Sequence, residues 1–97
     1  MEDKIEIKKK FKNAIASIHE IFKNEDLEIE LKELYNTNSL KFIEKSICYV
    51  FYNEHTYFNN TYKIDIDIED NTNKRLGSYV LYLDENENFV DEFFIIN

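Results

Sequence analysis

The apolar residues in the first quarter of the chain recur at helical spacing. From Ile5 to Phe22, steps of three and four residues separate most apolar positions, which is the pattern of one buried helix face. We therefore predict an amphipathic helix here. Lys8, Lys9 and Lys12 fall mostly outside the apolar stripe, so we expect them to form a solvated flank and not a nucleic acid patch. The stripe consists of Ile7, Phe11, Ala14, Ile15, Ile18, Ile21 and Phe22.

The stretch "KNEDLEIELKELYN" restarts the pattern and predicts a second helix. Asn24 can cap it, and the acidic residues that follow suit the positive end of a helix dipole. Leu27, Ile29 and Leu31 also alternate, which leaves a strand open, but the Glu, Leu and Lys content favours helix. The helical stripe would be Leu27, Leu31, Leu34 and Tyr35.

Residues 40–53 fit either a helix or a strand. The apolar positions at 40, 43, 47, 50 and 51 would form a helical stripe, whereas "SICYVFY" is rich in the β-branched and aromatic residues that favour strands. We predict a short helical turn near Leu40, followed by a strand over residues 46–53. Cys48, inside this segment, is expected to be a small buried hydrophobic residue.

The remaining chain has the features of strands. Ile64, Ile66 and Ile68 alternate strictly with polar residues, so one face of this strand should be buried and the other exposed. The segment "NTNKRLGS" is expected to be a loop, with Gly77, the only glycine, just before the next strand. The stretch "YVLYLDENENFVDEFFII" predicts a hairpin whose turn is "DENEN".

Together these elements predict a single domain over residues 1–97. Its fold class would be α+β, with two N-terminal helices packed on one face of an antiparallel β-meander of three to four strands. The 43% hydrophobic and 15% aromatic content supplies enough apolar side chain for a modest core.

The formal charge of −8 is unevenly distributed along the chain. Residues 1–24 hold six lysines against four acidic residues, whereas residues 25–97 hold sixteen acidic residues against six basic ones. An acidic chain repels phosphates, so we expect no direct nucleic acid binding and a basic protein partner instead. No apolar run approaches the roughly 20 residues of a membrane span, and the N-terminal stretch lacks the apolar segment of a signal peptide. We therefore expect a cytoplasmic protein that does not bind membranes.

Most catalytic and ligand signatures are excluded by counting. One glycine cannot build a phosphate loop, and a single cysteine can form neither an internal disulfide nor a cysteine zinc site. Asp84, Asn86 and Asn88 match three ligand positions of an EF-hand loop, but Phe89 and Ile95 stand where that loop needs Gly and Glu. We therefore predict no catalytic, cofactor-binding or metal-binding residues, and no enzymatic activity.

What remains as a candidate site is a surface. The C-terminal strands are apolar on both faces, and two helices should cover only one of them. The uncovered face would present tyrosine anchors ringed by carboxylates, which suits binding to a basic protein. Burial of these aromatics by loops or by a homodimer partner is the alternative. The predicted partner-binding residues are Asp65, Asp67, Glu69, Tyr79, Tyr82, Asp91 and Glu92.

Two N-terminal helices, a meander and a closing hairpin over residues 62–97 resemble the small acidic immunity proteins of bacterial polymorphic and contact-dependent toxin systems. The resemblance implies a non-catalytic antitoxin that blocks a cognate, basic toxin. A phage-encoded inhibitor, such as an anti-CRISPR that mimics nucleic acid charge, is the alternative. A small NTF2-like or cystatin-like ligand-binding domain or enzyme is a further one, and it would require a deep pocket between helix and sheet.

Overall fold

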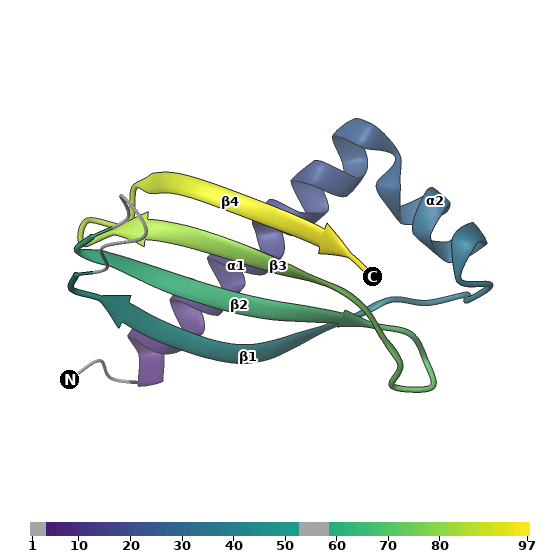
Figure 1. Ribbon diagram of the computed structural model, residues 1–97, viewed down its shortest axis with the longest axis horizontal. Coiled ribbons are helices and arrows are strands. Elements are labelled where there is room, and N and C mark those ends of the chain that lie inside the picture. Colours follow the sequence, from purple (N-terminus) through teal and green to yellow (C-terminus); the bar gives the residue numbers. More distant parts are fainter. Residues whose placement is uncertain (1–3, 53–58) are drawn as a thin grey trace.

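Two helices are followed by four strands in a computed structural model that describes residues 4–52 and 59–97. The strands form one antiparallel sheet in the order β1-β2-β3-β4, with β1 and β4 at its edges (Figure 1). This confirms the predicted α+β class. The elements are α1 (Lys4–Glu25), α2 (Leu27–Leu34), β1 (Lys41–Val50), β2 (Thr61–Glu69), β3 (Arg75–Asp84) and β4 (Phe89–Ile96).

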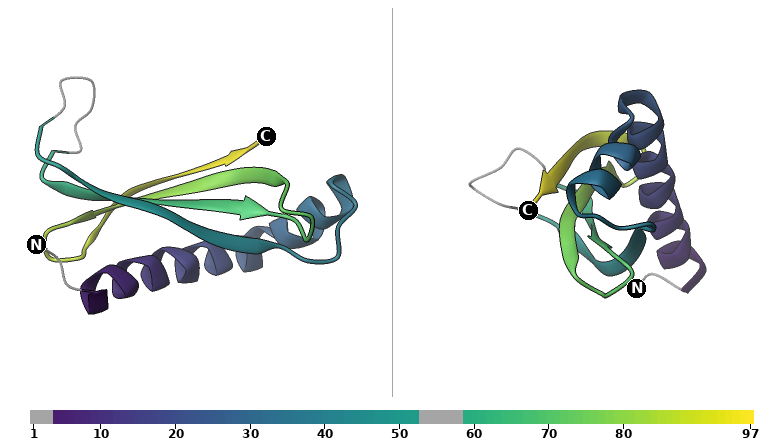
Figure 2. Two further views of the ribbon diagram at one scale, coloured as in Figure 1. Left: turned by 90° about the horizontal axis from the view of Figure 1, so that it is seen from below. Right: turned by 90° about the vertical axis from the view of Figure 1, so that its right-hand side faces the viewer.

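The core lies between α1 and one face of the sheet. Helix α1 runs along this face, while α2 lies near the end of the sheet where α1 ends (Figure 2). The predicted alternation in β2 is confirmed, because its three isoleucines are buried against the helix. The buried core residues of α1, β2 and β3 are Phe11, Ala14, Ile18, Phe22, Ile64, Ile66, Ile68, Tyr79, Leu81 and Leu83.

The second helix begins differently from the prediction. Helix α1 continues through Glu25, so Asn24 lies in its last turn and does not cap α2. The N-cap of α2 is Asp26, whose backbone is left-handed with φ 54° and whose side chain makes no capping hydrogen bond. Leu31 is buried, as the stripe predicted, but Leu34 is 69% exposed.

The predicted helical turn near Leu40 is wrong, because residues 41–50 form one continuous strand. Strand β2 offers hydrogen-bonding partners along this whole segment, from the pair Lys41–Glu69 to the pair Val50–Thr61. Pairing with β2 therefore overrides the helical spacing of the apolar residues. A bulge between Glu44 and Ser46 shifts the alternation, and Cys48 is exposed instead of buried.

Gly77 lies inside β3 and not in the loop before it. A Cβ atom at this position would stand 2.3 Å from the carbonyl oxygen of Ile95 on β4. Glycine therefore allows the backbones of β3 and β4 to approach each other closely. Within the described residues, no helix is long and apolar enough to cross a membrane.

Candidate protein-binding surface

One face of the sheet points away from α1, and within residues 4–52 and 59–97 no helix covers it (Figure 2). We call it the open face. The strand register places Ser46, Asp65, Val80 and Phe93 in one row across it, and Cys48, Lys63, Tyr82 and Asp91 in the next. A further row holds Ile43, Asp67, Ser78 and Ile95.

Apolar side chains gather on the β3–β4 side of the open face. The rings of Tyr82 and Phe93 meet edge to face, with their centroids 6.0 Å apart. Phe93 is 44% exposed and Ile95 is 55% exposed. Together with Val80, these side chains form an apolar patch of the kind that protein interfaces bury.

The carboxylates of β2 lie on the same face, but basic groups are interleaved with them. Asp67 forms ion pairs with Lys45 at 3.7 Å and with Arg75 at 3.4 Å. Asp65 accepts a hydrogen bond of 3.0 Å from the hydroxyl group of Ser46. The open face is therefore a surface of mixed charge, which differs from the predicted ring of carboxylates.

Five of the seven predicted binding residues are placed together by this geometry. Asp65, Asp67, Tyr82 and Asp91 lie in neighbouring rows of the open face. Glu69 continues the β2 series at the end of the strand, opposite Arg75.

Tyr79 and Glu92 do not belong to this surface. Tyr79 is fully buried on the face that α1 covers, so it cannot serve as an exposed anchor. Its hydroxyl donates a hydrogen bond of 2.5 Å to Oε2 of Glu92, which shares that face. The pKa of Tyr79 is raised, mainly by burial and to a smaller extent by this hydrogen bond to Glu92. Because β3 is apolar on both faces, its sequence could not indicate which of the two faces, and so which alternating side chains, α1 would cover.

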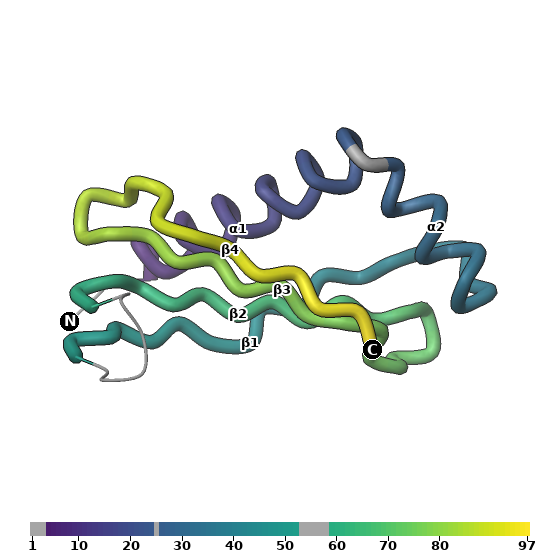
Figure 3. Tube along the Cα trace, turned by 45° about the horizontal axis from the view of Figure 1, so that its top comes forward, coloured from purple at the N-terminus to yellow at the C-terminus, as the bar shows by residue number. Residues whose placement is uncertain are grey.

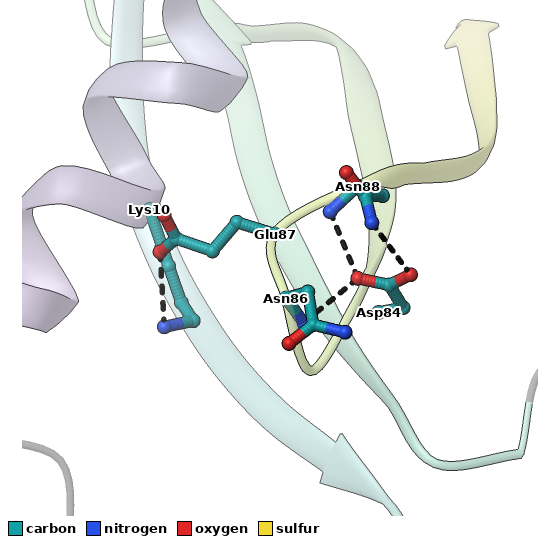
Figure 4. A network of polar contacts seen from close by, with 5 residues as sticks. All are labelled: Lys10, Asp84, Asn86, Glu87 and Asn88. Atoms are coloured by element: carbon teal, nitrogen blue, oxygen red, sulfur yellow. Dashed lines mark hydrogen bonds and ion pairs between the residues drawn. The ribbon is translucent and has the colours of Figure 1, made fainter.

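The "DENEN" segment is the hairpin turn that the sequence predicted (Figure 4). Oδ1 of Asp84 accepts hydrogen bonds from the backbone N–H groups of Asn86 at 2.8 Å and Asn88 at 2.9 Å. These donors, that of Asn88 first, lower the pKa of Asp84. In the part of the chain that the structure describes, no group of three or more His, Cys, Asp or Glu side chains is placed to hold a metal ion.

A buried lysine, which is not among the predicted binding residues, connects this turn to α1. Nζ of Lys10 lies 3.4 Å from Oε1 of Glu87 (Figure 4). The same Nζ lies 4.4 Å from the ring centroid of Tyr62. The Lys10 side chain is only 4% exposed. The position of Lys10 in the sequence already indicated burial, because it stands three residues after Ile7 and four before Ala14, on the apolar stripe.

A groove of about 460 Å³ lies between the N-terminal half of α1 and β1. The hydroxyl groups at its rim are already engaged, that of Ser46 with Asp65 and that of Tyr49 with Glu85. Lys45, which also lines the groove, pairs with Asp67. The groove is lined by Ile7, Phe11, Lys45, Ser46, Ile47, Tyr49 and Tyr62.

Comparisons with known proteins returned no matching family model, no matching curated protein and no matching solved structure.

Proposed function

We propose that this chain is a non-catalytic binding protein that docks a basic protein partner on the open face of its sheet. The observation that carries the proposal is the apolar patch of Val80, Tyr82, Phe93 and Ile95, which lies beside carboxylates on a face that no described helix covers. A patch of this kind, rimmed by polar groups, is typical of interaction sites.

The charge of the chain supports a basic partner. The formal net charge is −8, so a basic protein would be attracted from a distance and its association would be steered. Lys45 and Arg75 already pair with Asp67, whereas Lys63 on the open face would be matched by an acidic group on the partner. Such mixed patterns serve specificity, because a wrong partner meets like charges.

The biological role that fits this chemistry best is that of an immunity protein which blocks a cognate bacterial toxin. Such a protein needs shape and charge complementarity but no catalytic residues. Occlusion of a basic active-site surface would suffice for inhibition.

Co-purification with each candidate basic toxin tests the proposal. The purified chain should form a stoichiometric complex, inhibit the toxin in vitro and restore growth to cells that express it. Addition of salt should weaken the complex by slowing association. A double variant, Tyr82→Ala with Asp65→Lys, removes one aromatic contact and reverses one charge on the open face. We expect it to weaken binding by roughly 100-fold or more, as losses at interface anchors do.

Ile29→Lys is the matched control, since Ile29 is 60% exposed on α2 and lies outside the open face. It should bind as tightly as the unaltered chain. A complex that the control disrupts while the open-face variant leaves it intact would move the interface to α2 and refute the proposal. If the partner proves to be a nucleic acid-binding effector of phage defence, the proposed binding surface would stand, but the role as an immunity protein against a toxin would be wrong.

A further inference from the structure

The two edges of the sheet are protected to different degrees. Strand β1 carries Glu44 and Lys45 next to a bulge, and such features discourage pairing with another strand. Strand β4 has its bulge near its start, between Phe89 and Asp91, and ends in four consecutive apolar residues, Phe93 to Ile96. Its position at the edge is visible in Figure 3.

The backbone of β4 has hydrogen-bonding groups directed away from the sheet. The N–H of Asn97 donates to the carbonyl of Leu76, and at the other end the N–H of Asp84 donates to the carbonyl of Asn88. Hydrogen-bonded and non-hydrogen-bonded pairs alternate along an antiparallel ladder. Counted from Asn97, this alternation makes the N–H and C=O groups of Glu92, Phe94 and Ile96 point outward. Counted from Asn88, the bulge between Phe89 and Asp91 shifts the alternation by one residue, so the same three residues point outward.

The exposed side chains along this edge are large and apolar. The five exposed hydrophobic residues of β4 are Phe89 at 61%, Val90 at 36%, Phe93 at 44%, Ile95 at 55% and Ile96 at 41%. With about 200 Å² for a fully exposed aromatic side chain, they expose roughly 400 Å² of apolar surface per copy, of which strand pairing would cover the part nearest the edge. This is less than the ~800 Å² that each partner of a standard interface buries, so we expect a weak dimer that depends on concentration. The outward backbone edge and neighbouring side chains would add to this area.

We propose that β4 pairs with β4 of a second copy of this chain, antiparallel, about a two-fold axis at Phe93. This register hydrogen-bonds Glu92 to Phe94 of the second copy, which agrees with the outward groups. It places Phe93 beside its own equivalent, and Asp91 opposite Ile95. A register centred on Glu92 would instead set two carboxylates face to face, which is unfavourable.

The two-fold axis would stand perpendicular to the sheet. Both copies of α1 would then lie on the same side, and the two open faces would join into one eight-stranded surface with the Phe93 pair at its centre. The dimer would therefore bury the β4 edge and present the open face twice. Dimerisation through β4 goes beyond the proposed function, because binding of a basic partner on the open face does not require a dimer.

The first test measures the molecular mass in solution across a range of concentrations. The chain should move from 11.8 kDa at high dilution to twice that mass as concentration rises. Phe93→Lys should raise the dimer dissociation constant at least about tenfold, because it sets two charges side by side and removes an aromatic pair. Ile29→Lys should leave the dimer intact.

Engineered cysteines test the register in a Cys48→Ser background. Phe93→Cys should form a disulfide between copies, because non-hydrogen-bonded antiparallel pairs bring Cα atoms to about 4.5 Å, within disulfide range. Asp91→Cys alone should not cross-link, whereas a mixture of Asp91→Cys and Ile95→Cys chains should. A monomer at every concentration would refute the proposal, and so would a dimer with another cross-linking pattern.

Salt separates this proposal from the proposed function. Two copies of charge −8 repel each other, so salt should strengthen the dimer. Binding to a basic partner should instead weaken with salt. Protection of the outward β4 amides only when a different protein is bound, with the chain monomeric alone, would assign this edge to that partner and overturn the dimer.

Discussion

The hydroxyl of Tyr79 on β3 donates a hydrogen bond of 2.5 Å to Oε2 of Glu92 on β4, beneath α1. The two residues lie diagonally, because Tyr79 stands opposite Phe94 in the register. The contact therefore links the last two strands inside the core. It also explains why an acidic residue can stand on the buried side of β4, since the phenol supplies a hydrogen-bond partner.

Removal of this hydroxyl should destabilise the fold. Tyr79→Phe keeps the ring but leaves the Glu92 carboxylate without its phenol donor, at a cost of about 1.5–3 kcal/mol in the free energy of unfolding. Denaturant unfolding measures this loss. Tyr49→Phe is the matched control, because its hydroxyl donates to Glu85 at an exposed site, where water can replace it. Equal losses in the two variants would contradict a buried role for the Tyr79 contact.

The same two tyrosines should ionise late. The hydrogen bond from Tyr49 to Glu85 raises the pKa of Tyr49 from 10.0 to about 12, while burial is the main cause at Tyr79. A raised pKa favours the folded state below the unfolded value of 10.0, and this stability is lost as pH rises towards the folded value. The free energy of unfolding should therefore fall above about pH 10.

Ultraviolet titration of tyrosinate can separate the two causes. Glu85→Gln should return the pKa of Tyr49 towards 10.0, because its main cause is removed. Glu92→Gln should lower the pKa of Tyr79 only in part, since burial remains. A full return of Tyr79 to its ordinary value in this variant would show that the carboxylate, not burial, dominates.

The hairpin turns after β2 and β3 share one design, with an aspartate that accepts local N–H groups. Oδ1 of Asp70 accepts from the hydroxyl and N–H of Thr72 and from the N–H of Lys74, as Asp84 does from the residues that follow it. These bonds lower the pKa of both carboxyl groups, that of Asp70 mainly through the Thr72 hydroxyl. A lowered pKa adds stability above the unfolded value of 3.8, and this stability is lost as pH falls through the folded value.

Acid unfolding should therefore become shallower when both aspartates are replaced. Asp70→Asn with Asp84→Asn keeps an acceptor oxygen but cannot titrate, so the double variant should lose less stability than the unaltered chain below about pH 4. Urea unfolding at a series of acidic pH values measures the difference. Parallel pH profiles for the two proteins would refute a role for these turns.

The parts of the fold that the sequence predicted are those with a single strong periodicity. The three isoleucines of β2 and the stripe of α1 each had one apolar face, so their burial followed directly. Residues 41–50 carried two competing patterns, and only pairing with β2 decided between them. Tyr79 was misplaced for a related reason, since apolar residues on both faces of β3 leave the side of the helix undetermined.

The candidate site was predicted in part, because charge along the sequence does not reveal charge on a surface. Asp65 and Asp67 stand on one strand face, as their spacing required. Their neighbours across the sheet are Ser46 and Lys45 from β1 and Arg75 from β3, which are distant in sequence. Cross-strand register therefore turned a predicted acidic patch into one of mixed charge.

Gly77→Ala tests how closely β3 and β4 approach. The added Cβ would stand 2.3 Å from the carbonyl oxygen of Ile95, and backbone cannot yield as a flexible side chain can. We expect a loss of about 1–3 kcal/mol in the free energy of unfolding, typical of overpacking, and faster amide exchange along β4. Ser78→Ala is the control, because it changes the neighbouring residue without adding atoms. Equal stability of Gly77→Ala and Ser78→Ala would contradict the close approach of β3 and β4 at Gly77.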